Sequence, residues 1–147
     1  MANQGSEEAL VVLRAVLAFG RRLRAERPIS GVTLAELSIL AALERLGPVP
    51  ARQLAEEERL QPQSLTRMIS SLDRKNLISR SRSEEDHREI IIALSKHGRT
   101  VLIDDLRARK EWLDEVMAST LTGSERAQLL AGCTVMLALA SHADDGA

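Results

Sequence analysis

Apolar residues recur at helical spacing along most of this chain and alternate with polar residues over one short stretch. Side chains three or four positions apart predict six amphipathic helices. Two runs rich in β-branched residues, 77–82 and 89–94, alternate instead and predict strands joined by the turn 83–88. The pattern therefore predicts a mainly α-helical fold with a small β-hairpin. The predicted helices cover residues 6–27, 33–46, 51–57, 63–75, 95–117 and 124–142.

Two of the predicted helices begin with a capping box, in which a threonine and a glutamate three residues later satisfy free backbone amides. These pairs are Thr33 with Glu36 and Thr122 with Glu125. The starts of both helices are therefore predicted from residue spacing alone.

The helices 51–57 and 63–75 are separated by a sharp break and are followed at once by the hairpin. In the second helix an apolar stripe must face the core, which leaves a polar, basic face outward. Such a helix fits the major groove of duplex DNA, and an arginine-tipped hairpin can reach phosphates or the adjacent minor groove. The arrangement predicts a DNA-binding protein. The inward set is Leu65, Met68, Ile69 and Leu72, and the outward set is Gln63, Ser64, Arg67, Ser70 and Arg74.

Composition narrows the class of protein. The 147 residues are 28% charged and 44% hydrophobic, which suits one domain or two interlocked sub-domains. Phe19 and Trp112 are the only aromatic residues, so the core must be aliphatic. The single cysteine, Cys133, excludes an internal disulfide, and we interpret it as a small core hydrophobe rather than a redox switch. The sequence shows no secretory signal and no apolar run that could span a bilayer, which favours a cytoplasmic protein.

The charge of the chain is placed unevenly. Its formal net charge of −1 argues against non-specific coating of nucleic acid. Between Arg59 and Arg82, however, six cations stand against one acid, Asp73. The compensating acids lie in 56–58, in 84–86 and in the C-terminal half. A local basic surface of this kind agrees with specific DNA binding.

No residue set in the sequence points to an enzyme. A glycine-rich phosphate loop, a nucleophile elbow and paired metal-binding histidines are all missing, and no cofactor is expected. Glu84, Glu85 and His87 could hold a metal in principle, but ligands crowded on one turn rarely converge. We therefore expect neither an enzyme nor a metal protein.

The first and the last two predicted helices carry apolar stripes that a small DNA-reading module cannot cover. We expect residues 6–30 and 95–142 to be buried against the same helices of a second subunit. A two-fold dimer would place two recognition helices about 34 Å apart, which suits a pseudo-palindromic operator. An elongated monomer is the alternative.

Three stretches of the chain are typical of one known family: Leu34–Leu43, Leu65–Ile78, and the Asp86-His-Arg88 motif before an isoleucine-rich strand. Through them the chain resembles the MarR (multiple antibiotic resistance regulator) family over residues 6–142. The resemblance implies a winged helix-turn-helix over residues 33–94 and one domain of 1–147 with a helical dimerisation region. It also implies an obligate dimer that represses or activates nearby genes and that is often released from DNA by a small anionic or aromatic effector.

Two features depart from the family pattern. Gln61 stands where the family has a better helix cap, so the recognition helix is expected to begin with Pro62 at its first position. At the hairpin tip, Glu84 and Glu85 repel phosphate, so Arg88 must reach past them.

Three roles are expected among the DNA-binding residues. Gln63, Ser64 and Arg67 are expected to read base edges. The alternative is that they form a solvated helix face, which is the usual environment of surface arginines. Arg88 is expected to enter the minor groove, and Asp86 to pair with an arginine and hold the hairpin tip. The residues expected to contact phosphate are Thr66, Arg74, Lys75, Arg80 and Arg82. The full set is Gln61, Gln63, Ser64, Thr66, Arg67, Arg74, Lys75, Arg80, Arg82, Asp86 and Arg88.

Two functions are therefore in competition. The first is a sequence-specific transcriptional regulator, with an effector site expected between the long helices and residues 51–75. The second is a winged-helix module that binds protein and lacks DNA affinity, which the acidic hairpin tip and the negative net charge favour.

Overall fold

The computed structural model describes residues 2–142, with side chains from residue 5 onward. The chain falls into two compact units, residues 1–108 and 109–147, and the boundary lies inside the long helix α5. The first unit holds α1 (Ala2–Ala25), α2 (Leu34–Leu46), β1 (Val49–Pro50), α3 (Ala51–Glu57), α4 (Pro62–Arg74), β2 (Ile78–Arg82), β3 (Ile90–Leu94) and the start of α5 (Lys96–Thr120). The second holds the rest of α5 and α6 (Gly123–Ala140).

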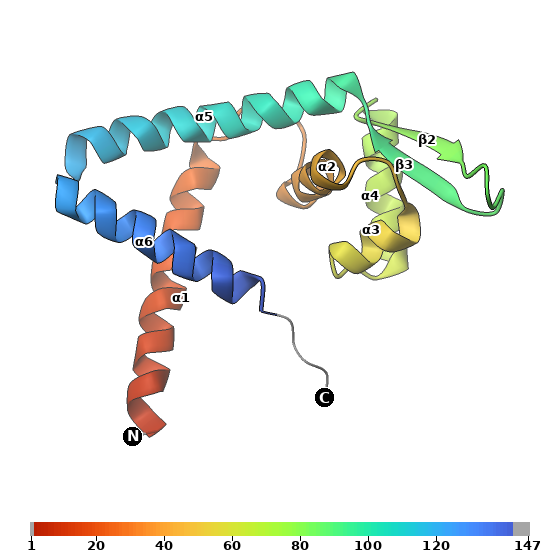
Figure 1. Cartoon of the computed structure of the whole chain (residues 1–147). Coiled ribbons are helices and arrows are strands. Elements are labelled where there is room, and N and C mark those ends of the chain that lie inside the picture. The colour runs from red at the N-terminus through yellow and green to blue at the C-terminus, as the bar shows by residue number, and fades with distance from the viewer. Residues whose placement is uncertain (1, 143–147) are drawn as a thin grey trace. The chain divides into compact units, whose positions relative to one another are not determined.

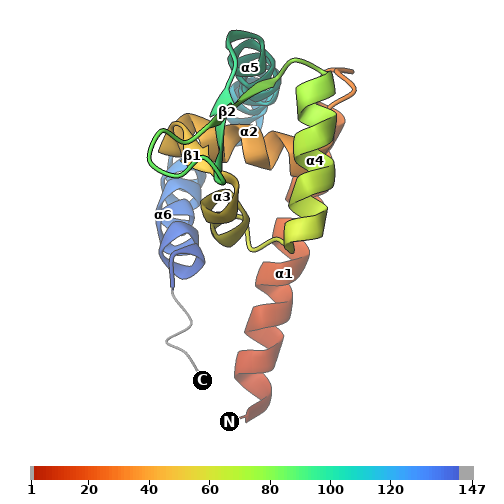
Figure 2. The ribbon, with the colours of Figure 1, turned by 90° about the vertical axis from the view of Figure 1, so that its right-hand side faces the viewer.

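A winged helix occupies most of the first unit. Helices α3 and α4 lie side by side and are joined by a tight turn, with α2 beside them (Figure 2). Strands β2 and β3 form an antiparallel hairpin that projects from these helices (Figure 1). The fold class predicted from the sequence, mainly helical with a hairpin wing, is confirmed.

The sheet has a third strand that the sequence pattern did not predict. β1 pairs with β3, so the order is β1-β3-β2, with Val49 opposite Ile92 and Pro50 opposite Ile91. Two residues show no periodicity, and a proline is an unusual strand residue except at an edge. β1 is such an edge strand. It fixes the base of the wing against the helix pair.

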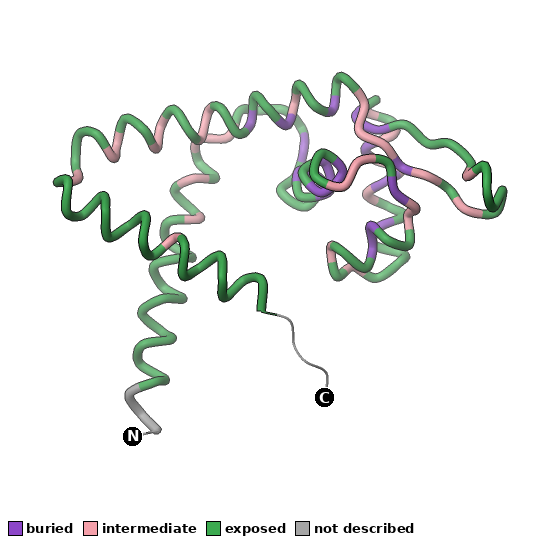
Figure 3. The backbone as a smooth tube through the Cα atoms, in the orientation of Figure 1, coloured by how far each residue is buried: buried purple, intermediate pink, exposed green. Residues whose placement is uncertain are grey.

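The hydrophobic core is aliphatic and belongs to the winged helix. Ile39, Leu40, Leu54 and Leu72 are completely shielded from solvent, and Ile92 is nearly so. Together the buried apolar residues come from α2, α3, α4, the strands and the first turns of α5 (Figure 3). Burial of aliphatic side chains at about 25 cal/mol per Å² is the main term that stabilises such a unit. The inward stripe predicted for α4 is confirmed for Leu65, Ile69 and Leu72, while Met68 is half-buried.

Local chemistry sets the ends of the helices. Both predicted capping boxes are present, Thr33 with Glu36 and Thr122 with Glu125. Helices α3 and α4 both end in a Schellman motif, whose extra residue has a positive φ: Arg59 at 51° and Asn76 at 59°. The helix-turn-helix therefore has two turns of one type, neither of which uses glycine.

Helix α5 begins in close contact with the turn that follows α4. The hydroxyl of Ser95 accepts a hydrogen bond from the Gly98 amide at 2.9 Å and donates one to the Asn76 carbonyl at 2.7 Å. A Cβ on Gly98 would lie 2.0 Å from the carbonyl oxygen of Leu77. Only glycine allows this approach. The start of α5 is thereby locked to the base of the wing.

Helices α1 and α6 are not part of this hydrophobic core, and many of their apolar side chains are exposed. Leu13 and Leu17 of α1 are 51% exposed, and Leu137 of α6 is 72% exposed. Within the part of α6 that the structure describes, no residue is buried (Figure 3). Cys133, expected to be a core hydrophobe, is only half-buried. Among the described residues, no helix is long and apolar enough to cross a membrane.

Candidate nucleic-acid interface

The outward face of α4 begins at its first residues. Gln61 is the N-cap residue, but its side chain caps no amide, and Pro62 occupies the first helical turn as the sequence predicted. Gln63, Ser64 and Arg67 are exposed, on the side opposite the buried stripe. Within residues 5–142, none of these three side chains is held by a hydrogen bond or ion pair to another residue. Their donors and acceptors are therefore available to an external partner.

Thr66 and Arg74 lie on the same helix but differ in their bonding. The Thr66 hydroxyl donates to the Pro62 carbonyl oxygen at 2.8 Å, a common use of threonine within a helix. Arg74 is exposed, and in the described part of the chain its guanidinium makes no ion pair. Arg74 is thus a cation that is available to a phosphate.

Lys75 and Arg80 were expected to contact phosphate, but both are engaged within the protein. The Lys75 ammonium donates to Gly31 and Glu36. The guanidinium of Arg80 donates through Nε and a terminal nitrogen to Asp73, at 2.9 and 2.5 Å. The Arg80–Asp73 pair is about 40% exposed on both sides, so water and salt screen it and it contributes little to stability. It nevertheless ties the wing strand β2 to α4.

The tip of the wing is shaped by short-range hydrogen bonds. The carboxylate of Asp86 accepts a bond from the Arg88 backbone amide at 3.0 Å, and the Ser83 hydroxyl accepts from the amides of Glu85 and Asp86. Asp86 was expected to pair with an arginine side chain; among the described residues it makes no such ion pair. The role of holding the tip is kept, with a backbone amide in place of a guanidinium.

Two arginines of the wing remain near the tip. Arg82 donates to the carbonyl oxygen of His87 at 3.3 Å, a long bond that a phosphate could replace. Arg88 is exposed, and among residues 5–142 its guanidinium has no acceptor. The carboxylates of Glu84 and Glu85 are exposed on the same turn. The tip therefore presents both signs of charge to a partner.

A groove of about 640 Å³ lies within the helix-turn-helix itself. Its lining comes from residues 51–66 of α3, the turn and α4, and includes Leu60, Leu65, Arg52 and Arg59. The sequence placed an effector between the long helices and residues 51–75, and this groove is lined by the second of these two regions alone. No group of three or more metal-binding side chains is close enough to hold an ion among the described residues.

The relation to known proteins agrees with this geometry. The sequence profile of the MarR family matches residues 32–90, from the start of α2 to the first residue of β3. An uncharacterized HTH-type transcriptional regulator of Mycobacterium bovis is 37% identical over 138 residues, which cover 94% of this chain and 93% of that protein. The chain belongs to the MarR family.

Two further relatives of this MarR-family protein extend the comparison. The HTH-type transcriptional repressor MdtR of Bacillus subtilis is 34% identical over 115 residues, covering 78% of this chain and 73% of MdtR. The crystal structure of the YusO protein of Bacillus subtilis superimposes with a TM-score of 0.70 at 30% identity, over 96% of this chain and 99% of YusO. The protein is a transcriptional regulator of helix-turn-helix type.

Sequence reasoning missed one group at this site. Glu36 was assigned only to the capping box, although it also accepts both hydrogen bonds from Lys75. The two residues are 39 positions apart, so no local spacing pairs them. The only signal in the sequence was that Glu36 interrupts the apolar stripe of α2. An acid that is buried at such a position needs a hydrogen-bonding or charged partner.

Proposed function

We propose that this MarR-family protein is a sequence-specific DNA-binding regulator that acts as a homodimer on a pseudo-palindromic operator. The observation that carries the proposal is the exposed face of α4, where Gln63, Ser64 and Arg67 have no partner among the described residues beside an arginine-bearing wing. Arginine and glutamine can each form two hydrogen bonds to one base edge, worth about 1–3 kcal/mol of discrimination per pair. The face is thus suited to reading sequence.

The other residues of the interface divide by role in the proposal. Arg88 enters the minor groove, with the wing tip held by Asp86. Arg74 and Arg82 contact phosphate, as does the start of α4 at Gln61. Thr66 and Arg80 also face the duplex, although both already bond within the chain.

Dimerisation is proposed from the exposed apolar residues of α1 and α6. A single chain leaves Leu10, Leu13 and Leu17 of α1, and Leu130 and Leu137 of α6, more than 40% exposed. Exposed apolar surface on this scale marks an interface in soluble proteins. The test variant is Leu137→Glu on α6. Its matched control is Gln128→Glu, which adds the same charge to an exposed polar position of that helix. Light scattering is expected to show a monomer for the first and a dimer for the second.

Repression, with release by a small-molecule effector, completes the proposal. Its support is membership of the MarR family and the relative MdtR, which is named a repressor. Because the partner is chromosomal DNA, the protein would act in the cytoplasm, without a cofactor and without catalysis.

The experiment is a titration of the dimer with duplex DNA from upstream of its own gene, and with duplexes selected from a random library, at two salt concentrations. A steep fall of affinity with salt, by a factor that scales with the phosphates contacted, is expected for the selected duplex. Arg67→Ala is expected to relax the sequence preference, while Arg82→Ala should lower the affinity for all DNA sequences alike.

A protein-binding module is the second candidate. The exposed Glu84 and Glu85 at the wing tip favour it, because they oppose phosphate. Failure of the selection to yield any duplex with salt-dependent affinity would support this alternative and contradict DNA regulation.

A further inference from the structure

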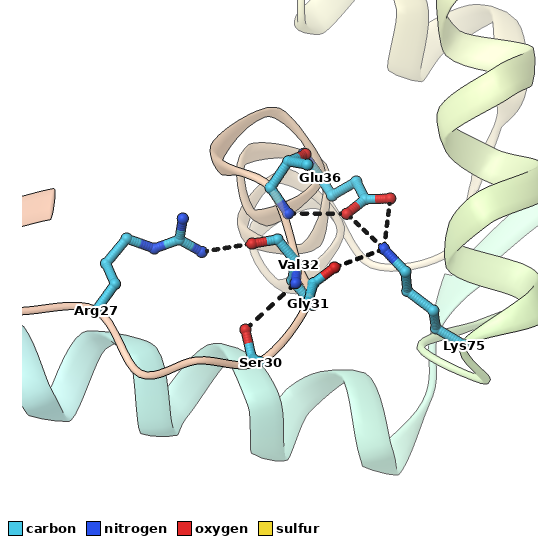
Figure 4. Close-up of polar contacts among 7 residues, drawn as sticks. Arg27, Ser30, Gly31, Val32, Glu36 and Lys75 are labelled. Carbon is cyan, nitrogen blue, oxygen red and sulfur yellow. Dashed lines mark hydrogen bonds and ion pairs between the residues drawn. The ribbon is translucent and has the colours of Figure 1, made fainter.

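The ammonium group of Lys75 is hydrogen-bonded to acceptors of its own chain, although the side chain is 34% exposed. Its Nζ donates to the carbonyl oxygen of Gly31 at 2.9 Å and to the two carboxylate oxygens of Glu36 at 2.9 and 2.8 Å (Figure 4). A lysine ammonium has three N–H donors. All three are therefore used within the protein, and none is left for a phosphate oxygen.

These contacts join three separate segments. Lys75 is the C-cap residue of the recognition helix α4, and Glu36 lies in the first turn of α2. Gly31 belongs to the linker between α1 and α2 and has a φ of 70°, which glycine adopts without strain. One side chain thus holds the C-terminal end of α4 against the start of α2 and against the linker.

The carboxylate of Glu36, which binds Lys75, is buried and hydrogen-bonded. The Glu36 side chain is 5% exposed, and one of its oxygens also accepts the Thr33 amide at 2.9 Å. Burial acts to raise the pKa of Glu36, but the hydrogen bonds from Lys75, Ser71 and Thr33 outweigh it and hold the pKa below its ordinary value. The Glu36 carboxylate is therefore ionised at neutral pH.

The same linker is held from its other side. The guanidinium of Arg27 donates to the Val32 carbonyl oxygen at 2.9 Å, next to Gly31, and to Asp105 of α5 at 2.7 Å. Arg27 and Asp105 have side chains that are 14% and 1% exposed. Two cations thus bind adjacent carbonyl groups, one from α4 and the other anchored to α5 (Figure 4). The linker is a fixed support for the end of the recognition helix.

We propose that Lys75 is a positioning residue that fixes the tilt of α4 through Glu36 and Gly31, and that it does not contact DNA phosphate. The inference rests on the proposed function. The face formed by Gln63 and Arg67 lies roughly 12–18 Å along the helix from Lys75, at 1.5 Å per residue. Release of the far end lets the helix tilt and displaces this face, and bidentate hydrogen bonds tolerate little displacement.

The neighbouring residue is a matched control. Arg74 carries the same charge at the same helix end, is exposed, and has no ion-pair partner among the described residues. Lys75→Met and Arg74→Met each remove one positive charge. Glu36→Gln removes the acid but keeps the capping box, because glutamine serves equally at that position. This last variant also makes the protein more positive, which by charge alone should tighten its binding to DNA.

The test measures affinity for a duplex selected by the wild-type protein from a random library, and for a scrambled duplex of the same length, over a series of salt concentrations. Thermal unfolding of every variant is measured first, and the titrations are made well below the lowest midpoint. The double variant Glu36→Gln/Lys75→Met is included, because residues that act as one unit give non-additive losses.

For Lys75→Met and for Glu36→Gln, affinity for the selected duplex is expected to fall by several-fold to about a hundredfold, the range of a lost base contact. Affinity for the scrambled duplex and the slope of log affinity against log salt are expected to stay unchanged. The double variant should lose no more than either single variant. Arg74→Met should instead weaken binding to both duplexes and reduce the slope by about two, because the dimer loses one phosphate contact in each subunit.

Three results would overturn the inference. A reduced slope for Lys75→Met together with unchanged or tighter binding by Glu36→Gln would show that Lys75 contacts phosphate. Full affinity of both variants would show that the contact has no positioning role, and additive losses would show that the two residues act separately. If the wild-type protein selects no duplex at all, it is the proposed function that fails.

Discussion

The winged helix and the helices α1 and α6 are built from similar residues but reach different degrees of burial. In the winged helix, aliphatic side chains from α2, α3, α4 and the strands shield one another almost completely. In α6, leucines are as frequent, yet none is buried in the single chain. The first region thus contains its own core, and the second presents apolar surface that another molecule would have to cover.

This contrast separates two sources of stability. Side chains of the winged helix contribute whatever the protein concentration is. In the proposed dimer, those of α1 and α6 would contribute through assembly, which depends on concentration by mass action. Pairs of identical substitutions, one in each region, can therefore test whether the contrast is real.

Leucine truncation is expected to give the largest effect. Leu72 is fully buried, so Leu72→Ala should lower the free energy of unfolding by about 2–5 kcal/mol at every protein concentration. Leu137 is 72% exposed, and Leu137→Ala should cost less than about 0.5 kcal/mol in dilute protein. Urea unfolding at a series of concentrations checks both. A cost for Leu137→Ala that is equally large in dilute protein would contradict the contrast.

Replacing a glycine by alanine is expected to give the next largest difference in stability between the two regions. Gly98→Ala brings a Cβ to 2.0 Å from the Leu77 carbonyl oxygen, so backbone must move, and a loss of about 1–3 kcal/mol or more is expected. Gly132 in α6 has nothing within 4 Å of an added Cβ, and Gly132→Ala should raise stability by about 0.5–1 kcal/mol. The two unfolding midpoints should move in opposite directions. A loss for Gly132→Ala in dilute protein would be inconsistent with an open α6.

The ion pair between Lys75 and the buried Glu36 makes the stability of the winged helix depend on acid pH. Because the folded pKa of Glu36 is lowered, its contribution is present above the unfolded value of about 4.3 and disappears as the pH falls through the folded value. Glu36→Gln should therefore cost about 1.5–3 kcal/mol near pH 6, as for hydrogen bonds to charged groups. The gap between wild type and variant should narrow toward pH 3. A constant gap between those pH values would assign the loss to packing.

Most of the fold could be predicted from the sequence because it rests on local signals. The capping boxes at Thr33 and Thr122 and the proline start of α4 are short-range features, and all are found as expected. The hairpin was recognised from its alternation. Strand β1 was not, since Val49 and Pro50 pair only with residues more than forty positions away.

In the candidate site, too, local features could be predicted from the sequence and contacts between distant residues could not. The exposure of Gln63 and Arg67 follows from helical period, which the sequence displays. The partners of Lys75 and Arg80 depend on which acid the fold brings near them, and Glu36 is 39 positions from Lys75. A count of cations therefore overstates how many are available to phosphate, because it cannot show which are already bonded.

The smallest predicted effect compares the two Schellman turns of the helix-turn-helix. Asn76 tolerates its φ of 59° because asparagine adopts the left-handed region readily, whereas Arg59 at 51° carries the steric cost of its Cβ. Arg59→Gly should therefore raise the free energy of unfolding by up to about 1 kcal/mol, and Asn76→Gly should change it little. Urea unfolding in parallel with the DNA titration checks this. No gain for Arg59→Gly would mean that the arginine side chain offsets the strain within the protein. A gain in stability together with weaker DNA binding would instead show that the strained turn holds a cation for the duplex.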